Sequence, residues 1–313
     1  MKEKKNLLIP KICTVILTHN EEEHIVRAIN SVKNITEDIL VVDSYSTDKT
    51  VDLALSNGAT IVQNKFINHS NQFNWSLQHV KPNIDWILRL DADEIITSKL
   101  QDELIESLSN ISDDISGISL RRRIVFMGKE IKWGGIFPIQ VVRMFRYGRG
   151  KCEDRLMDEH INIDGKIISN FFGEIHDINL HPLSRWIEKH NKYSNLEALE
   201  VLKKEINSKN SMDSETNYKL HSSAKIKRII KERIYVNLPA QIRPFLYFMY
   251  RFFLRLGFLD GKDGASFHFL QGFWYRYLVE LKIIQLRKAM TEKKLTLSKA
   301  ALMIFNIDIS GES

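Results

Sequence analysis

Cysteine is scarce in this sequence, with two residues, Cys13 and Cys152, in a chain of 313. They lie far apart and in no Cys-x-x-Cys spacing, which argues against a disulfide framework or a thiolate zinc site and favours a reducing compartment. The sequence also lacks an internal repeat, a low-complexity tract and a Gly-rich basic phosphate loop near its start. Its lysine-rich first residues precede no apolar run of signal-peptide length, so we expect a cytoplasmic protein.

Charge is unevenly distributed along a chain of otherwise ordinary globular composition, 43% hydrophobic and 27% charged. The net charge is +6, yet residues 219–294 contain 16 Lys and Arg against 5 Asp and Glu, so the remainder is net acidic. This asymmetry predicts two regions with different partners. Composition alone does not decide whether the basic region faces nucleic acid, an anionic membrane or solvent.

Short aliphatic runs alternate with helical patterns over the first hundred residues. "ICTVILT", "DILVVDS", "ATIVQN" and "DWILRLDADE" are typical of buried strands, and the segments between them have helical spacing. The alternation predicts an α/β fold with a largely parallel central sheet. Ligands bind at the carboxyl ends of strands in such sheets, where "THNEEE", "DSYSTD" and "DADE" are expected to lie.

The second half of the chain has a different organisation. Residues 118–180 contain short β-like segments, and a helical pattern resumes at 184–206. The polar stretch 207–218 is interpreted as a linker or mobile loop. We therefore predict a first domain at 1–206 and a mainly helical, basic and aromatic-rich region at 219–313.

Three carboxylates, Asp91, Asp93 and Glu94, follow the predicted strand "WILRL". Carboxylates are hard ligands suited to Mg²⁺ or Mn²⁺, which commonly share their coordination with substrate phosphates. An isolated Asp-x-Asp more often caps a helix or pairs with lysines, and Ser46 and Thr47 can likewise act as simple N-caps. Three such polar segments at one predicted sheet edge favour a metal and nucleotide site.

Four segments resemble the N-terminal half of family 2 glycosyltransferases with the GT-A fold: "VILTHNEEEHI", "ILVVDSYSTDKTVDLA", "NQFNWSL" and "WILRLDADEII". The sequence looks most like bacterial enzymes that extend lipopolysaccharide core or exopolysaccharide chains. The resemblance covers residues 10–205. The segment "LGFLDGKDGASFHFLQGFWYRYLVELK" is similar to a tail that many such enzymes carry.

This resemblance implies roles for residues by position. Asp43 would hold the uracil of a nucleotide sugar. The residues that would line the same pocket are Thr18, Asn20, Glu21 and Ser44. Asp91 would contact the ribose or the metal, and Asp93 would be the main ligand of Mn²⁺ or Mg²⁺, which stabilises the leaving nucleoside diphosphate.

An inverting transfer also needs a general base for the acceptor hydroxyl. The family usually places an acidic residue after the middle β region, where "RLMDEHI" offers Asp158 and Glu159. On a strand these side chains point opposite ways, so one of them faces the sugar, and Asp158 is slightly favoured. The structural alternative is an exposed turn with an ion pair to Arg155.

Some positions depart from the family pattern or are ambiguous within it. Tyr45 stands where many relatives carry Gly, and "NQFN" stands where they carry a basic pair, which leaves the sugar undetermined. His181, His190 and Tyr193 surround a helix that resembles the family's acceptor-side helix. An ordinary core or surface role is at least as well supported for each of them.

The segment "PAQIRPFLYFMYRFFLRLGFLD" is aromatic and apolar but contains Arg243, Arg251 and Arg255, so it does not predict a clean membrane span. Cationic residues among Phe, Tyr and Leu are typical of amphipathic helices at an anionic membrane surface. The alternative is packing against the catalytic domain or a second subunit. No nucleic-acid-binding motif is present, so a nucleic-acid partner is not expected.

Together these patterns predict a metal-dependent, inverting hexosyltransferase peripherally bound to the inner face of a bacterial cell membrane. It would use a UDP-sugar donor and a lipid-linked glycan or a lipopolysaccharide or exopolysaccharide precursor as acceptor, with homo-oligomerisation left open. A nucleotidyltransferase is an alternative that usually needs the missing phosphate loop. A non-catalytic, membrane-associated scaffold with a degenerate transferase fold is the other.

Overall fold

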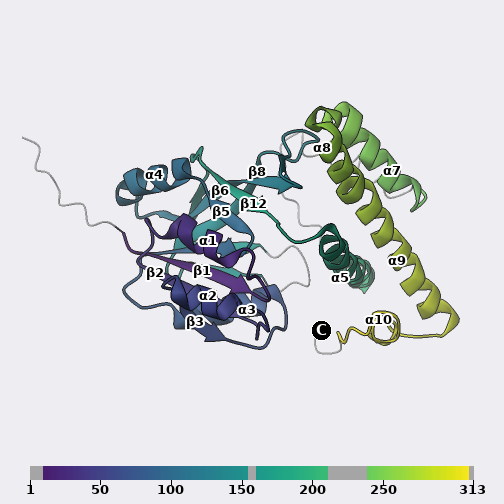
Figure 1. Ribbon diagram of the computed structural model, residues 1–313. Coiled ribbons are helices and arrows are strands. Elements are labelled where there is room, and N and C mark those ends of the chain that lie inside the picture. The colour runs from purple at the N-terminus through teal and green to yellow at the C-terminus, as the bar shows by residue number, and fades with distance from the viewer. Residues whose placement is uncertain (1–9, 154–159, 211–237, 310–313) are drawn as a thin grey trace, which may run out of the picture. The chain divides into compact units, whose positions relative to one another are not determined.

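The computed structural model describes residues 10–153, 160–210 and 238–309 (Figure 1). The chain forms two compact units, Met1–His181 and Pro182–Ser313. The boundary lies earlier than the position 206 expected from the sequence, because the helix after His181 packs within the second unit. That helix also runs through residues 207–210, where a linker was expected.

The first unit combines a large sheet with four α-helices among its described residues. Its strands are β1 (Ile12–Thr18), β2 (Asp38–Asp43), β3 (Thr60–Gln63), β4 (Trp86–Asp91), β5 (Glu94–Ile96), β6 (Ile115–Phe126), β7 (Lys129–Glu130), β8 (Ile139–Arg146), β9 (Gly150–Cys152), β10 (Ile161–Ile163), β11 (Lys166–Ile168) and β12 (Glu174–Ile178). Its helices are α1 (Ile25–Val32), α2 (Thr50–Ser56), α3 (His69–Ser76) and α4 (Ser98–Ser107), with 3₁₀ turns η1 (Leu77–His79) and η2 (Leu108–Asn110).

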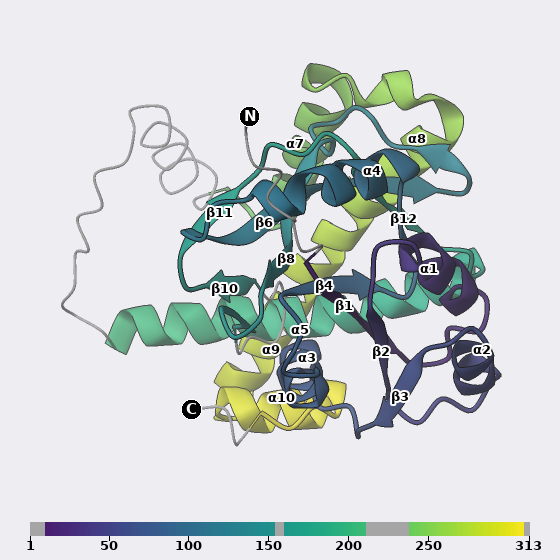
Figure 2. The same ribbon diagram turned by 90° about the vertical axis from the view of Figure 1, so that its left-hand side faces the viewer.

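The main sheet has the order β3-β2-β1-β4-β8-β6-β12-β5, and β7 and β11 also pair with β6. Strands β3, β2, β1 and β4 are parallel, as the βα alternation predicted, and lie side by side in Figure 2. Beyond β4 the sheet is mixed: β8 runs antiparallel to β4 and to β6, and β12 is parallel to β6 but antiparallel to β5. The prediction of an α/β fold is confirmed, with parallel pairing concentrated in the first half of the sheet.

Both faces of β1 are buried, because its side chains alternate between two separate clusters. Ile12 and Ile16 belong to a core that includes buried residues of α1, α2 and α4. Cys13 and Val15 belong to a second core, which contains Phe73 of α3. Burial on both faces explains why β1 is a nearly continuous apolar run rather than an alternating one.

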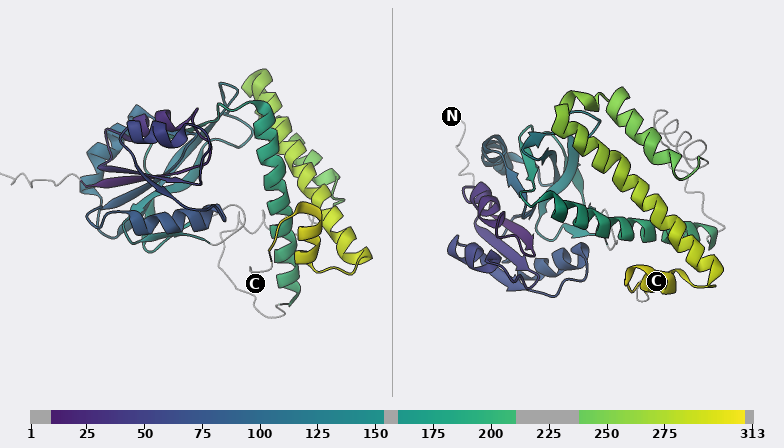
Figure 3. Two further views of the ribbon diagram at one scale, coloured as in Figure 1. Left: turned by 60° about the horizontal axis from the view of Figure 1, so that its bottom comes forward. Right: turned by 45° about the vertical axis from the view of Figure 1, so that its right-hand side comes forward.

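The second unit is helical. Its described elements are α5 (Leu183–Asn210), α7 (Ile242–Met249), the π-helical turn η4 (Tyr250–Leu254), the 3₁₀ turn η5 (Gly257–Asp260), α8 (Gly261–Phe267), the π-helical segment η6 (His268–Trp274), α9 (Tyr275–Glu292) and α10 (Leu297–Phe305). Figure 3 shows α5 and α9 packed against each other at an angle, with α10 beside one end of α9. The predicted mainly α-helical C-terminal region is confirmed.

Polar side chains tie α5 to α9 inside this unit. Lys282 donates through Nζ to the Asn191 carbonyl at 2.6 Å, to Asn191 Oδ1 at 2.7 Å and to Ser194 Oγ at 2.6 Å. Burial lowers the pKa of Lys282 to about 8. Tyr275 donates its hydroxyl to Glu197 at 2.6 Å, and Arg276 pairs with the same carboxylate. These bonds fix the register of the two helices.

A second internal network lies between η4 and η6. Arg251 donates through Nη1 to Gln271 Oε1 at 2.5 Å, and its Nη2 lies 3.3 Å from His268 Nδ1. His268 Nε2 lies 2.9 Å from Asp260 Oδ2, and Arg251, His268 and Asp260 are all buried. Arg251 is therefore internal. It does not lie on the polar face that the amphipathic-helix interpretation implied, because it bonds to Gln271 and His268 inside the unit.

Within the described ranges, the structure contains no helix that combines the length and the apolar character needed to cross a bilayer.

Substituting Arg251 tests whether the Arg251–His268–Asp260 network stabilises the second unit. We expect Arg251→Met to lower the free energy of unfolding by about 3 kcal/mol, because it leaves the buried Asp260 carboxylate with less compensation. Chemical denaturation followed by circular dichroism measures the change. Arg255→Met is the matched control, since Arg255 is exposed at the end of η4 and should change stability little. Equal effects of the two substitutions would contradict an internal role for Arg251.

Candidate active site

The polar strand ends predicted from the sequence meet at one edge of the parallel sheet. β1 lies between β2 and β4, and its register places Thr18 beside Asp43 and Leu17 beside Asp91. Thr18, Asp43 and Asp91 are the last residues of these three strands. The carboxyl edge of the sheet therefore carries the candidate residues in one row, as the alternation of strands and helices predicted.

Asp43 is fully buried and accepts four hydrogen bonds. Oδ1 accepts from the Thr18 hydroxyl at 3.1 Å and from the Ser46 hydroxyl at 2.5 Å. Oδ2 accepts from the Ser46 backbone N–H at 2.9 Å and from the Gln63 amide at 3.0 Å. A carboxylate has about four acceptor positions, so a nucleobase could bond to Asp43 only if one of these donors moved.

The turn after β2 is shaped by bonds to the turn after β1. Asn20 adopts a left-handed backbone conformation (φ 57°) and accepts a bond at Oδ1 from the Thr47 N–H at 2.8 Å. The Asn20 N–H donates to Ser46 Oγ at 2.8 Å. Helix α2 begins at Thr50, so Ser46 and Thr47 do not cap it as the simplest sequence interpretation held. Ser44 Oγ accepts from the Gln72 amide of α3 at 3.1 Å, which ties the same turn to the neighbouring helix.

Asp91 lies in a cluster of charged side chains at the end of β4, of which Glu94, Arg143 and Arg89 are buried. Arg143 of β8 donates through Nη2 to Asp91 Oδ2 at 2.7 Å and to Glu94 Oε1 at 2.5 Å. Glu94 Oε2 accepts from the Asp91 backbone N–H at 3.0 Å, and Arg89 Nε lies 3.7 Å from Asp91 Oδ1. Arg122 lies 3.9 Å from Glu94. Both carboxylates are therefore compensated by guanidinium groups of the chain itself.

The two carboxylates of this cluster have opposite pKa shifts. Burial alone would raise the pKa of Asp91, but the charges of Arg143 and Arg89 outweigh burial and hold it well below its usual value. Burial raises the pKa of Glu94 to about 7, against the opposing charge of Arg143 and with the help of the Asp91 charge. Asp91 is thus the acid that stays ionised, and Glu94 is the acid that can carry a proton near neutral pH.

Asp93 is half-buried and lies against the end of β12. Its carbonyl accepts from the Ile178 N–H at 2.9 Å, and the Asn179 amide lies 3.5 Å from its Oδ2. Both aspartates supply the hard oxygen ligands that Mg²⁺ and Mn²⁺ prefer. The two carboxylates therefore have the chemistry that a divalent cation would need at this edge of the sheet.

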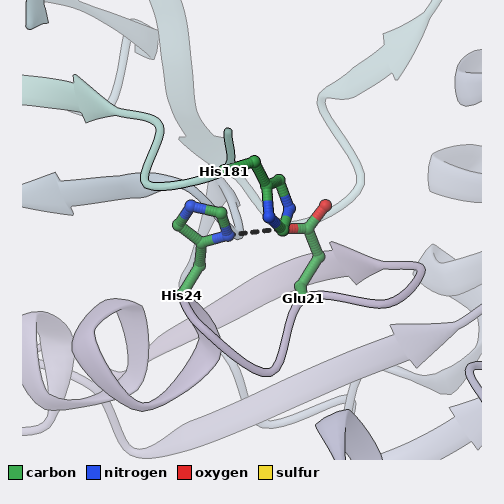
Figure 4. A group of neighbouring side chains, drawn as sticks. All are labelled: Glu21, His24 and His181. Carbon is green, nitrogen blue, oxygen red and sulfur yellow. Dashed lines mark hydrogen bonds and ion pairs between the residues drawn. The ribbon is translucent and has the colours of Figure 1, made fainter. Parts of the chain in front are cut away.

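Glu21 forms a cluster with His24 and His181 (Figure 4). Glu21 Oε2 lies 2.6 Å from His24 Nδ1 and 3.4 Å from His181 Nε2, and the two rings meet edge to face. The ligand atoms lie within 4.8 Å of one another, as in a metal site. However, the Leu180 N–H donates to His24 Nε2 at 2.8 Å, so the ring proton is on Nδ1 and donates to Glu21. His24 then has no lone pair left for a cation.

The Glu21 cluster is therefore a structural contact that joins the β1–α1 turn to the segment after β12. That segment also contacts Asp93 through Asn179, and the His181 N–H donates to Asn179 Oδ1 at 2.9 Å. The Glu21 cluster thus connects the turn that carries Asn20 and Glu21 to the backbone beside Asp93.

Several site residues were not assigned from the sequence. Glu94 was recognised as part of the acidic segment but received no role, and Arg143 and His24 were not proposed. Arg143 lies 49 residues from Glu94, and no local pattern connects them. The two candidates for the general base, Asp158 and Glu159, lie outside the described residues.

Comparison with known proteins shows similarity to one family. Residues 13–157 match the family described as glycosyl transferase family 2. An uncharacterized glycosyltransferase of Rickettsia bellii is 48% identical over 98 residues, which are 31% of this chain and 33% of that protein. The uncharacterized glycosyltransferase RT0209 of Rickettsia typhi is 27% identical over 306 residues, 96% of this chain and 95% of that protein.

More distant relatives share shorter segments. The glycosyltransferase SunS of Bacillus subtilis is 33% identical over 92 residues, 29% of this chain and 22% of that protein. A crystal structure of glucosyl-3-phosphoglycerate synthase from Mycobacterium tuberculosis, in complex with Mn²⁺, UDP and glucosyl-3-phosphoglycerate, matches with a TM-score of 0.29. The match is 20% identical and covers 37% of this chain and 44% of that one.

The raised pKa of Glu94 predicts a pH-dependent stability. The native state binds a proton at Glu94 that the unfolded chain, with an ordinary value of 4.5, has released. The free energy of unfolding should therefore fall as pH rises from about 4.5 to about 7, by at most about 3 kcal/mol. Glu94→Gln should abolish this slope in denaturant titrations of metal-free protein, and Glu106→Gln, at an exposed position of α4, should retain it. An unchanged slope in Glu94→Gln would contradict the shift.

Proposed function

We propose that this chain is a member of glycosyl transferase family 2 and that it transfers a hexose from a UDP-sugar to an acceptor hydroxyl with inversion at the anomeric carbon. The observation that carries the proposal is the row of Thr18, Asp43 and Asp91 at the carboxyl edge of the parallel sheet, followed by Asp93. The acceptor we propose is a lipid-linked glycan or a lipopolysaccharide or exopolysaccharide precursor.

The nucleoside would bind over the turns that follow β1 and β2. Asn20, Ser46 and Thr47 join these turns through their hydrogen bonds, and the buried Asp43 holds the arrangement rigid. Preorganisation of this kind reduces the ordering cost of binding. Asp43 would bond to the base by exchanging one of its four present donors for the N–H of uracil.

The diphosphate would lie near Asp91 and Asp93. Asp93 would hold Mn²⁺ or Mg²⁺, with Asp91 contacting the ribose or the same ion. A bound divalent cation supplies charge stabilisation for the departing nucleoside diphosphate. The chain's own residues would orient the donor so that the anomeric carbon faces the acceptor hydroxyl. Asp158, or alternatively Glu159, would remove the proton from that hydroxyl.

Asp93 provides the direct test of this proposal. We expect wild-type protein to bind one UDP-sugar only in the presence of Mn²⁺ or Mg²⁺, and Asp93→Asn to weaken that binding at least about tenfold. Calorimetric titration with a panel of UDP- and GDP-sugars measures the affinity and identifies the donor. Asp113→Asn is the control, because Asp113 is a fully exposed aspartate that is not among the acids at the carboxyl edge of the parallel strands.

Failure of this test has a definite meaning. If folded wild-type protein binds no nucleotide with either metal, the catalytic proposal is wrong, and a non-catalytic scaffold becomes the better interpretation. Metal-dependent binding of a nucleoside triphosphate instead of any nucleotide sugar would favour a nucleotidyltransferase.

We further propose that the second unit binds the surface of an anionic membrane. Exposed apolar side chains recur every four residues along α7 and η4 at Ile242, Leu246, Tyr250 and Leu254, and Leu254 is 76% exposed. Phe245 and Phe253 are also exposed beside them, and we call these six residues the apolar ridge. A spacing of four places its members on one side of the helix.

The charge of the chain around the apolar ridge supports a lipid partner. Residues 219–294 have 16 basic and 5 acidic side chains; Arg251 and Lys282 among them are buried, whereas Arg255 at the end of η4 is exposed. Apolar side chains flanked by cations match the interface of an anionic bilayer, where the former enter the acyl boundary and the latter meet the headgroups. The protein would then reach a lipid-linked acceptor from the cytoplasmic face of the membrane.

Substitution in the apolar ridge tests the lipid partner. Wild-type protein should float with vesicles of phosphatidylglycerol and phosphatidylcholine, and less so at high salt. Leu254→Asp should lower the partition coefficient at least about tenfold, since burial of a Leu side chain contributes about 2 kcal/mol. Leu302→Asp on α10 is the control, as Leu302 is also about half-exposed but lies outside the apolar ridge. Wild-type dimers that Leu254→Asp converts to monomers, without vesicle binding, would identify a second copy as the partner instead.

A further inference from the structure

One nitrogen atom of Arg143 joins Asp91, the first acid of the Asp-x-Asp segment, to Glu94, which follows that segment. Nη2 lies 2.7 Å from Asp91 Oδ2 and 2.5 Å from Glu94 Oε1, while Glu94 Oε2 accepts the Asp91 N–H at 3.0 Å. Asp91, Glu94 and Arg143 therefore form a closed ring of hydrogen bonds. Both the side chain and the backbone of Asp91 take part in it.

We infer that Arg143 and Glu94 are positioning residues, which act through Asp91 to hold it in the orientation that the bound donor requires. This inference rests on the proposed function, because it assigns Asp91 to the donor site. Arg143 and Glu94 do not touch the donor themselves in this scheme. They are 7% and 1% exposed at their side chains, whereas the Asp91 side chain is 36% exposed and accessible to a ligand.

The sheet topology explains how Arg143 reaches this position. β8 runs antiparallel to β4, with Trp86 paired to Arg146 and Leu88 to Met144. Arg143 precedes Met144 in β8. Because the two strands run in opposite directions, Arg143 lies beside the residues that follow Leu88 at the end of β4. If β8 ran parallel to β4, the C-terminal end of β8 would lie at the carboxyl edge of the sheet, and Arg143 would not be followed by residues that run away from that edge. The antiparallel strand thus brings a cation from a distant part of the sequence to the carboxyl edge.

Orientation accounts for this ring better than stability does. A buried ion pair gains little net stability, because desolvation of both partners offsets their attraction, and an apolar pair of similar volume often does as well. Here one guanidinium is shared by two acids, and one of those acids also fixes the backbone N–H of Asp91. Such an arrangement restricts Asp91 to one rotamer and leaves its exposed side toward the ligand.

Epistasis between Arg143 and Asp91 tests the inference. Metal-dependent UDP binding is measured by calorimetry for wild type, Arg143→Met, Asp91→Asn and the double variant. We expect Arg143→Met and Asp91→Asn each to weaken binding about tenfold or more. If Arg143 acts through Asp91, the double variant binds no more weakly than Asp91→Asn alone. Arg143→Lys, which keeps a cation able to bridge both acids, should restore part of the affinity.

Two further variants separate positioning from folding. Arg143→Met combined with Glu94→Gln removes both partners of the Arg143–Glu94 pair, so no buried Glu94 is left without its cation, and this combined variant should still bind UDP about tenfold more weakly. Arg146→Met changes an arginine of the same strand that bonds to the Ile115 carbonyl instead, and it should bind UDP as wild type does. Thermal melts report which variants are folded.

The outcomes distinguish this inference from the proposed function. Fully additive losses in the double variant, or unchanged affinity in folded Arg143→Met protein, would overturn the positioning role while leaving the transferase proposal intact. Absence of metal-dependent nucleotide binding in wild type would overturn both.

Discussion

The parallel pairing of β1 with β2 and β4 is the constraint on which the candidate site depends. Parallel strands end at the same edge of a sheet, and the register places Thr18 directly beside Asp43 and Leu17 beside Asp91. Burial of β1 on both faces keeps this register from slipping, since a shift of one residue would move every side chain to the other core. The rigid centre of the sheet therefore decides where the polar groups of three separate turns meet.

Each acid at this edge is stabilised by a different kind of partner. Asp43 accepts from hydroxyl and amide groups, Asp91 shares Arg143 with Glu94, and Glu21 accepts from a histidine whose tautomer is set by a backbone N–H. Buried carboxylates are costly unless they are compensated in such ways. The compensation also orients them, so the edge of the sheet is organised before any ligand arrives.

A simple surface helix buries its apolar side chains and exposes its charged ones, whereas part of the second unit does the reverse. Arg251, His268 and Asp260 are inside, whereas Phe253 and Leu254 are exposed on the adjoining turn. The buried charges hold η4, η5 and η6 together, which leaves the aromatic and aliphatic side chains of α7 and η4 available to a partner. Internal polar bonds and external apolar groups are thus two consequences of the same packing.

Local patterns in the sequence were enough to predict the α/β class, the strand ends at which polar residues gather and the helical nature of the C-terminal region. These features follow from local periodicity, because burial imposes a period of two on strands and 3.6 on helices. Four features emerged from the three-dimensional contacts alone: Arg143 joins Asp91, Asn179 contacts Asp93, Arg251 is internal and α5 belongs to the second unit. Those contacts connect residues tens of positions apart, and they depend on strand order and on which helix faces which neighbour. A local pattern carries no information about partners that are brought together by the antiparallel course of β8 or by the packing of α5 on α9.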